Sequence, residues 1–240
     1  METLEDFSLC LSLGFDFFQG YFFYKTETIK DKNKKMDVSR LSIMRSLAAI
    51  MSSRADFSVL EPIISQDVRL SYKLLRLVNS GYYSMAYGVK SIQHAISLMG
   101  LQQLRGWLLL LTMTTVDDKP HILTTIALQR AKMCELLGKD LRDRQTESYF
   151  LIGLLSVLDA IMDLPMCEVV ENLSLANELS EALVSRTGRL GMVLTGVIAA
   201  EGGNWDNVLP LGFKPEAWQD IYYESAKWSS MVMNQVGEEE

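Results

Sequence analysis

The spacing of the apolar residues is the feature that most constrains the fold of this chain. From Met36 onward this spacing is typical of helices almost without interruption. Ile43, Leu47 and Ile50 fall on one helical face, and comparable apolar stripes recur in the segments that follow. After Lys35 no segment alternates apolar and polar residues as a strand does. The sequence therefore predicts an all-α main body.

Polar residues, glycines and a proline mark the expected ends of these helices. Asp67 opens a helix that the break at 79–81 ends, and Gly100 separates two further helices. Pro120 precedes a helix over 123–141, and the apolar stretch FLIGLLSVLD at 150–159 is assigned to the next helix. Three more helices are expected at 168–172, 175–185 and 188–200.

The first residues follow a different pattern. METLEDFSLCLSL is typical of a helix, and the aromatic run FDFFQGYFFY that follows favours a strand. Gly14 lies between them, where a helix commonly ends. Residues 25–35, KTETIKDKNKK, carry five lysines and little that is apolar, so they are expected to form an exposed connection. We therefore divide the chain into 1–26, a linker at 27–35 and a helical domain at 36–240.

Composition restricts the classes of partner. The formal net charge is −7, so nucleic acid and anionic membranes are not expected partners. The longest apolar run, Trp107 to Met113, is shorter than the roughly 20 residues that span a bilayer. No basic leader precedes an apolar segment, so a cytoplasmic location is expected. Cys10, Cys134 and Cys167 are too few and too far apart for a disulfide framework, and we expect buried thiols.

Catalytic and metal-binding motifs find little support. Helical spacing brings no second ligand beside His94, and His121 lies in an expected turn. Asp159 and Asp163 are four residues apart on one helical face, but they lie near a helix end, where acids are commonly solvated or capping. No serine-nucleophile or phosphate-loop motif is present. We therefore expect no metal, no cofactor and no catalytic residue.

Several separated stretches of the main body resemble the HDOD domain, a degenerate relative of the HD phosphohydrolases found in bacterial signalling proteins. Order and spacing agree over residues 36–230, which implies an HD-like bundle of many helices. One departure is Asp67-Val68, where the family often has Asp-Pro. The stretches are LSYKLLRLVNSGYY, SIQHAISLMGLQQLRGWL, ALQRAKMCELLG, FLIGLLSVLD and TGRLGMVLTGVIAAEGGNW.

The resemblance gives a meaning to the stretch at 150–159. Active HD proteins carry Gly-Leu-Leu-His-Asp in the corresponding helix, and its His and Asp hold metal ions. Here Gly-Leu-Leu is followed by Ser156 and Val157. Serine is a poor ligand for a divalent cation and valine is none. The resemblance thus implies a regulatory or interaction module, and we expect no enzymatic activity.

The stretch ETLEDFSLCLSLGFDFFQGYFF is similar to the last helix and strand of an EAL domain, a barrel that hydrolyses cyclic di-GMP. The Glu-Ala-Leu signature and the other metal-binding acids of that barrel have no counterpart in these residues. We therefore expect residues 1–26 to be a helix-strand remnant of an EAL barrel. The chain would then be the carboxy-terminal part of an EAL–HDOD signalling protein.

Three hypotheses for function follow. The first is a non-catalytic signalling module, coupled to cyclic di-GMP, that acts on unidentified signalling proteins; a homodimer is left open. The second is an HD-type phosphohydrolase with an unorthodox site built from Asp159, Asp163 or His94. The third is a nucleotide sensor whose pocket is lined by Asn79, Ser80 and His94. We favour the first, with Asn79 and Ser80 capping their helix.

Overall fold

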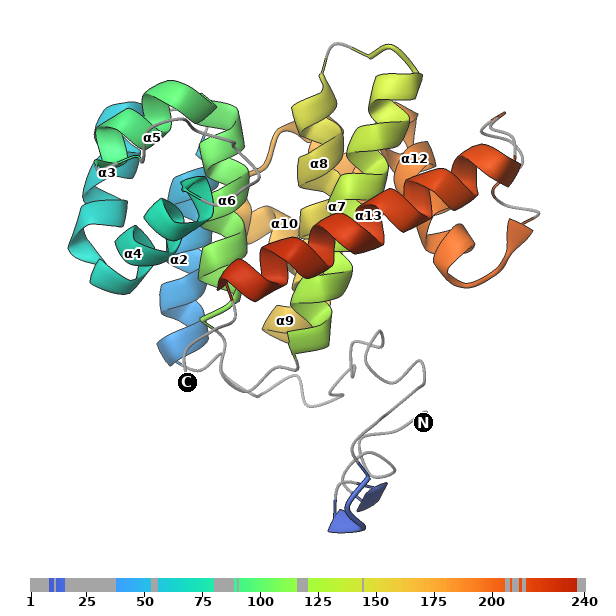
Figure 1. The fold of residues 1–240 in the computed structure, drawn as a ribbon, viewed down its shortest axis with the longest axis horizontal. Helices are drawn as coiled ribbons and strands as arrows, with labels where there is room; N and C mark the ends of the chain where they lie inside the picture. The colour runs from blue at the N-terminus through green and yellow to red at the C-terminus, as the bar shows by residue number, and fades with distance from the viewer. Residues whose placement is uncertain are drawn as a thin grey trace.

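The main body of the computed structural model consists of helices (Figure 1). The structure describes residues 9–10, 12–15, 38–52, 56–79, 89, 91–115, 121–143, 145–205, 208, 212 and 215–236. The prediction of an all-α body is confirmed for this part of the chain. Its helices are α2 (Val38–Met51), α3 (Phe57–Gln66), α4 (Val68–Val78), α5 (Ile92–Met99), α6 (Leu101–Met113), α7 (His121–Asp140), α8 (Thr146–Leu155), α9 (Leu158–Met162), α10 (Met166–Leu173), α11 (Asn177–Val184), α12 (Gly188–Glu201) and α13 (Pro215–Val236).

The helices are arranged around a central pair, α7 and α8, which lie side by side (Figure 1). Helices α2 to α6 form one side of the bundle, and α12 lies on the other side. The long α13 crosses in front of α7 and also contacts α4. One continuous apolar core results, and residues from all of these helices contribute to it.

The close approach of α7 and α8 depends on two glycines. A Cβ atom on Gly153 would lie 2.5 Å from the backbone of Ala131, and one on Gly138 would lie 2.6 Å from the ring of Tyr149. Real Cβ contacts are longer than this, so neither position accepts a side chain without movement. Glycine at position 153 therefore lets the backbones of α7 and α8 come into contact, and glycine at position 138 lets the ring of Tyr149 pack against the backbone of α7.

Local capping fixes helix ends as the sequence predicts. The carboxylate of Asp67 accepts hydrogen bonds from the backbone N–H groups of Arg69 and Leu70, at 2.9 and 3.0 Å. These bonds satisfy two of the amides that a helix start leaves without partners. At the other end of the body, α12 stops at Gly202, and Gly203 has a φ of 69°. Both ends are set by chemistry within a few residues.

The stretch 150–159 is not one helix, so that expectation is wrong. Helix α8 ends at Leu155, a turn follows, and α9 begins at Leu158. The hydroxyl of Ser156 donates to the carbonyl of Gly153 at 2.7 Å, and the Ser156 amide bonds to the same carbonyl. This carbonyl is therefore used by a tight turn instead of a helical bond from residue 157.

Helix α13 was missed by the interpretation of the sequence, which assigned no helix beyond residue 200. Its buried side chains recur at intervals of three and four residues, as on one face of a helix. Two exposed tyrosines, Tyr222 and Tyr223, lie on its other faces. The buried residues are Trp218, Ile221, Ser225, Trp228, Ser229, Val232 and Val236.

Several predictions about single residues can now be checked. Trp107, the first residue of the longest apolar run, is buried, with 2% of its surface exposed. Cys134 is buried, but Cys167 is exposed, so the expectation of buried thiols is wrong there. Cys167 lies in the first turn of α10, whose inward face is formed by the residues around Val169 instead.

Only a small part of the predicted EAL remnant is described. Leu9, Cys10 and Ser12 are helical, and Gly14 has a φ of 81°. The amide of Phe15 bonds to the carbonyl of Cys10 at 3.1 Å, which is typical of a helix end at a glycine. The predicted strand and the linker lie outside the described residues, so the likeness to an EAL barrel is not shown by this structure.

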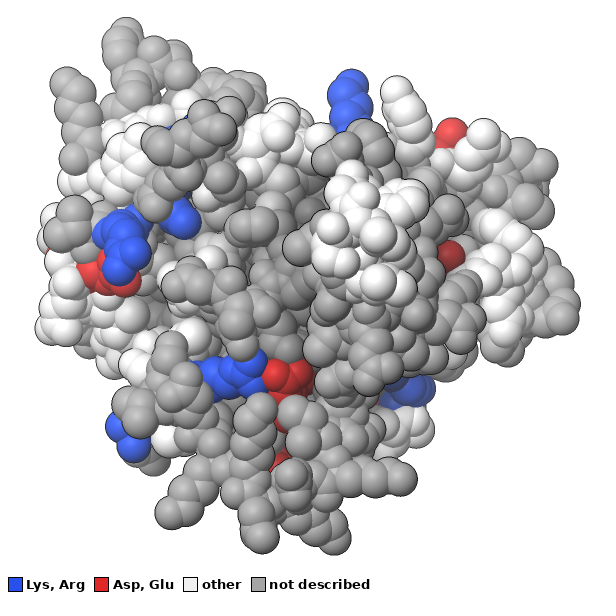
Figure 2. Space-filling view, turned by 90° about the horizontal axis from the view of Figure 1, so that it is seen from below, with Lys and Arg blue, Asp and Glu red and all other residues white. Residues whose placement is uncertain are grey.

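Surface charge and hydropathy bear on the expected partners. Seen from below, the basic and acidic side chains that are described lie scattered, and some of opposite charge adjoin (Figure 2). One stretch, Asn177–Glu201, has the length and hydropathy of a membrane-spanning helix, and 50% of its apolar 18-residue window is buried inside the fold. In the structure it is divided between α11 and α12. Buried core helices commonly pass such a test, so it is weak evidence for a membrane span.

Candidate functional site

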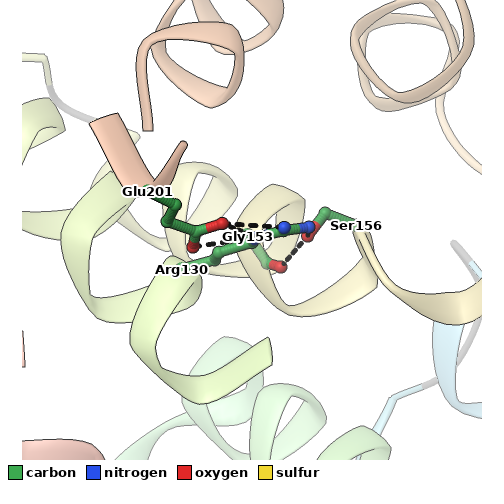
Figure 3. Close-up of polar contacts among 4 residues, drawn as sticks. All are labelled: Arg130, Gly153, Ser156 and Glu201. Carbon is green, nitrogen blue, oxygen red and sulfur yellow. Dashed lines mark hydrogen bonds and ion pairs between the residues drawn. The ribbon is translucent and has the colours of Figure 1, made fainter. Parts of the chain in front are cut away.

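A buried ion pair lies beside the turn between α8 and α9 (Figure 3). Arg130, on α7, is 6% exposed, and its Nη1 donates to the Ser156 hydroxyl at 3.3 Å. Its Nε donates to both carboxylate oxygens of Glu201, at 3.0 and 2.9 Å, and its Nη2 lies 2.7 Å from Oε2. One guanidinium therefore joins α7, the α8–α9 turn and the last residue of α12.

Burial makes this pair sensitive to the loss of either partner. The side chains of Arg130 and Glu201 are 8% and 13% exposed, so each has given up most of its hydration. A planar guanidinium that contacts both carboxylate oxygens offsets that loss better than a single contact would. The adjacent Cys134 thiol is also buried, and its burial, together with the charge of Glu201, raises its pKa far above the usual value.

A second guanidinium, that of Arg186, lies close to the first. Its backbone is left-handed, with a φ of 58°, and the backbone of α12 packs against it where Gly191 has no side chain. Burial and the positive charge of Arg130 lower the pKa of Arg186, while Asp159 acts in the opposite direction. Two arginines and two carboxylates thus form a charge-balanced interior cluster.

The cluster assigns a definite role to Ser156. Its hydroxyl donates to Gly153 and accepts from Arg130, so both its donor and an acceptor position are used. The resemblance implies a metal ligand at this position in active relatives. In this chain the position is a serine, and its hydroxyl contacts the positively charged guanidinium of Arg130. Within the described residues, no three His, Cys, Asp or Glu side chains gather as metal ligands.

The structure separates the two acids that the sequence placed on one helical face. Asp163 ends α9 with a φ of 52° and forms an ion pair with Arg40 of α2. Asp159 lies in the first turn of α9, accepts from the Ala160 amide at 2.9 Å and faces the charge of Arg186. The two carboxylates therefore do not converge on a shared proton or ligand, as the hydrolase hypothesis requires.

The structure describes two of the three residues of the predicted pocket, Asn79 and His94, in separate surroundings. Asn79 caps α4, and its side-chain amide donates to the Val89 carbonyl at 2.9 Å and accepts from the Val89 amide. His94 is exposed on α5, where its backbone N–H bonds to Ser91. Ser80 lies outside the described residues. Asn79 therefore fixes the entry of the chain toward α5, as a cap is expected to do.

Arg130, Glu201 and Arg186 were not predicted as site residues. One signal for Arg130 is present in the sequence, because it shares an otherwise apolar helical face with Ile126, Met133 and Leu137. A cation at such a position needs a buried partner. No local spacing identifies that partner, since Glu201 lies 71 residues further along the chain.

Comparison with known proteins decides the family. The HDOD domain family matches residues 40–183. The chain belongs to the HDOD family. No solved structure matches this HDOD chain.

Two curated relatives match almost all of this HDOD chain. "Cyclic di-GMP phosphodiesterase CdgJ" of Vibrio cholerae serotype O1 (strain ATCC 39315 / El Tor Inaba N16961) is 34% identical over 238 residues, which is 97% of this chain and 55% of the relative. "Uncharacterized protein YuxH" of Bacillus subtilis (strain 168) is 30% identical over 241 residues, or 98% of this chain and 58% of the relative. The HDOD chain therefore spans somewhat more than half the length of each.

The expectation that the chain is not an enzyme is contradicted by the first of these relatives, whose name is that of a phosphodiesterase. The expectation rested on two positions, Ser156 and Val157, and on the absence of barrel signature residues. The likeness to CdgJ covers 97% of the chain and is not confined to these positions. Two replaced ligands in one helix turn therefore do not decide the activity of this HDOD protein.

Proposed function

We propose that this chain takes part in cyclic di-GMP signalling as a helical regulatory part that controls phosphodiesterase activity. The observation that carries the proposal is the 34% identity to a cyclic di-GMP phosphodiesterase across 97% of the chain. The match includes both the helical body and the residues before it. The similarity therefore extends beyond the residues that the HDOD family model matches.

The charge cluster supports a regulatory role for the bundle. Arg130 and Glu201 hold the end of α12 against the α8–α9 turn, and separating them deprives each buried charge of this opposite charge. Breaking such a contact is costly, because the buried charges lose each other without regaining their full hydration. The contact therefore favours one arrangement of α12 and gives the bundle a defined state that a partner can change.

The exposed side of α13 offers a surface for that partner. Tyr222 and Tyr223 are 50% and 71% exposed, and Met231 is 41% exposed. Tyrosine and methionine are enriched where proteins contact one another, because they bury a large area at a low cost in conformational entropy. We accordingly propose a signalling protein or a second copy of the chain as the partner of this surface.

The test measures cyclic di-GMP in two settings. In bacterial cells that express the chain, chromatography and mass spectrometry of the nucleotide pool should show a changed cyclic di-GMP level, and Glu201→Gln should alter that change. The matched control is Glu168→Gln, an exposed glutamate outside the cluster, which should behave as the unaltered chain. With the purified chain, conversion of cyclic di-GMP to its linear dinucleotide is followed with Mg²⁺ or Mn²⁺. Unchanged cellular cyclic di-GMP together with no conversion in vitro overturns the proposal.

A further inference from the structure

A cavity of about 350 Å³ lies away from the charge cluster, between the α5–α6 turn and helices α7, α8 and α13. Ligand cavities in proteins commonly measure about 300–1,000 Å³, so this one is near the lower limit. Its size suits one planar ring system and is small for a whole dinucleotide. Its wall combines aromatic rings with carboxylates and amides, which is the composition of a selective site more than that of a packing defect.

Three aromatic rings form the apolar wall. The Trp107 and Trp228 centroids are 5.9 Å apart, and Phe150 lies 6.3 and 6.0 Å from them. Both tryptophans are buried, whereas Phe150 is half-buried and lines the cavity. The Phe150 ring rests on Gly106, where a Cβ atom would lie 3.0 Å from it. Phe150 is therefore a fixed aromatic surface on which a planar base can stack.

Amides and carboxylates form the polar part of the wall. Gln102 and Gln103 are exposed in the first turn of α6, and Glu147 is exposed in the first turn of α8. Glu135 is already held by Lys132 at 3.0 Å and by Lys139. Glu147 has no such ion pair with the residues that the structure describes, so its carboxylate is the acceptor that a ligand can use.

We propose that this cavity binds the guanine base of a guanine nucleotide. Guanine presents two adjacent donors, N1–H and N2–H₂, which one carboxylate accepts together, and it presents O6 and N7 as acceptors. Glu147 supplies the carboxylate, Gln102 and Gln103 supply amide donors, and Phe150 supplies the stacking surface. Adenine places an acceptor, N1, beside its amino group, so a carboxylate meets a lone pair and adenine is disfavoured.

The choice of cyclic di-GMP as the guanine nucleotide rests on the function proposed above. The cavity accommodates one of its bases, and the remainder of the molecule stays outside. Bound in this way, the nucleotide contacts α6, α8 and α13, since these helices supply wall residues. The site thereby gives the bundle a means of sensing the nucleotide whose turnover it controls.

Isothermal titration calorimetry and tryptophan fluorescence of the whole chain test the proposal, with GMP, AMP, cyclic di-GMP and cyclic di-AMP as probes. GMP and cyclic di-GMP should bind at least tenfold more tightly than their adenine counterparts, with a change in tryptophan emission. Glu147→Gln should abolish the preference, because an amide offers one acceptor and one donor where guanine needs two acceptors. Phe150→Leu should weaken binding tenfold or more. Glu168→Gln, in the first turn of α10, is the matched control and should bind as the unaltered chain.

Circular dichroism of each variant establishes that it is folded before titration. The proposal is overturned if neither guanine nucleotide binds at millimolar concentration, if adenine nucleotides bind equally well, or if folded Glu147→Gln keeps the preference for guanine. These failures are separate from failure of the proposed function. A chain that changes cellular cyclic di-GMP without binding guanine overturns only the cavity, and guanine binding without any effect on cyclic di-GMP overturns only the function.

Discussion

Removal of one charge from the Arg130–Glu201 pair provides a direct test of the interior charge cluster. The substitution Glu201→Gln keeps the size of the side chain and removes its charge. Arg130 then remains charged, 6% exposed, and without the carboxylate that it contacts at 2.7 to 3.0 Å. The opposite substitution, Arg130→Met, leaves the carboxylate alone and also removes the donor to Ser156.

The expected cost follows from burial. Removing one partner of a buried ion pair costs about 3–5 kcal/mol, because the remaining charge loses that opposite charge without regaining its full hydration. With side-chain exposures of 8% and 13%, this pair falls in the buried class. For a chain of this size, 1 kcal/mol shifts the melting temperature by about 2–4 °C, so Glu201→Gln should lower it by roughly 6–20 °C. The double variant Arg130→Met/Glu201→Leu removes both charges and should recover most of the loss.

Urea denaturation followed by circular dichroism measures the free energy of unfolding of the unaltered chain and of these three variants. Lys139→Gln is a control for an exposed pair, since the side chain of Lys139 is 49% exposed where it meets Glu135. It should cost only about 0.3–0.5 kcal/mol. If Glu201→Gln costs less than about 1 kcal/mol, the pair behaves as a surface pair. The reasoning from burial is then refuted.

Three further predictions concern stability. Gly153→Ala places a Cβ atom 2.5 Å from the backbone of Ala131, so it should cost at least about 1–3 kcal/mol in urea denaturation, and an unchanged midpoint would contradict the close helix contact. Asp67→Ala removes the cap of α4 and should cost about 1 kcal/mol, whereas Asp67→Asn should cost much less; equal losses would speak against capping. Burial raises the pKa of Glu135, but the hydrogen bond from Lys139 and the charge of Lys132 outweigh it and hold this pKa below its usual value. Its stabilising contribution is therefore present above the unfolded pKa of about 4.3 and is lost as the pH falls through the folded pKa. The difference in free energy of unfolding between the unaltered chain and Glu135→Gln should shrink below that pH, and a constant difference would contradict the assignment.

Helix content and many helix ends were predictable because they depend on neighbouring residues. Asp67 caps α4 through amides two and three residues away, and Gly202 ends α12 by local geometry. The length of α13 was equally local, since its buried side chains follow helical spacing, and an analysis of that spacing beyond residue 200 would have found it.

The candidate site was much less predictable. The sequence suggested Asp159 and Asp163, which share a helical spacing, but Asp163 pairs with Arg40 of α2, whereas Asp159 accepts a bond from the Ala160 amide. The turn at Ser156 interrupts the helix on which that spacing was counted. Periodicity shows on which face of its own helix a residue lies. It does not show which other helix packs against that face.

The sequence by itself determined an all-α body, its main helix boundaries and the serine and valine at 156 and 157. Tertiary structure alone decided what surrounds that serine. Arg130 reaches it from 26 residues away and binds Glu201 from 71 residues away. Glycines in α7 and α8 let these two helices approach closely, and Ser156 at the end of α8 then lies within reach of Arg130, while Glu201 comes from α12. Local propensity determines where the helices form. Which of their faces come into contact is determined only when the whole core packs.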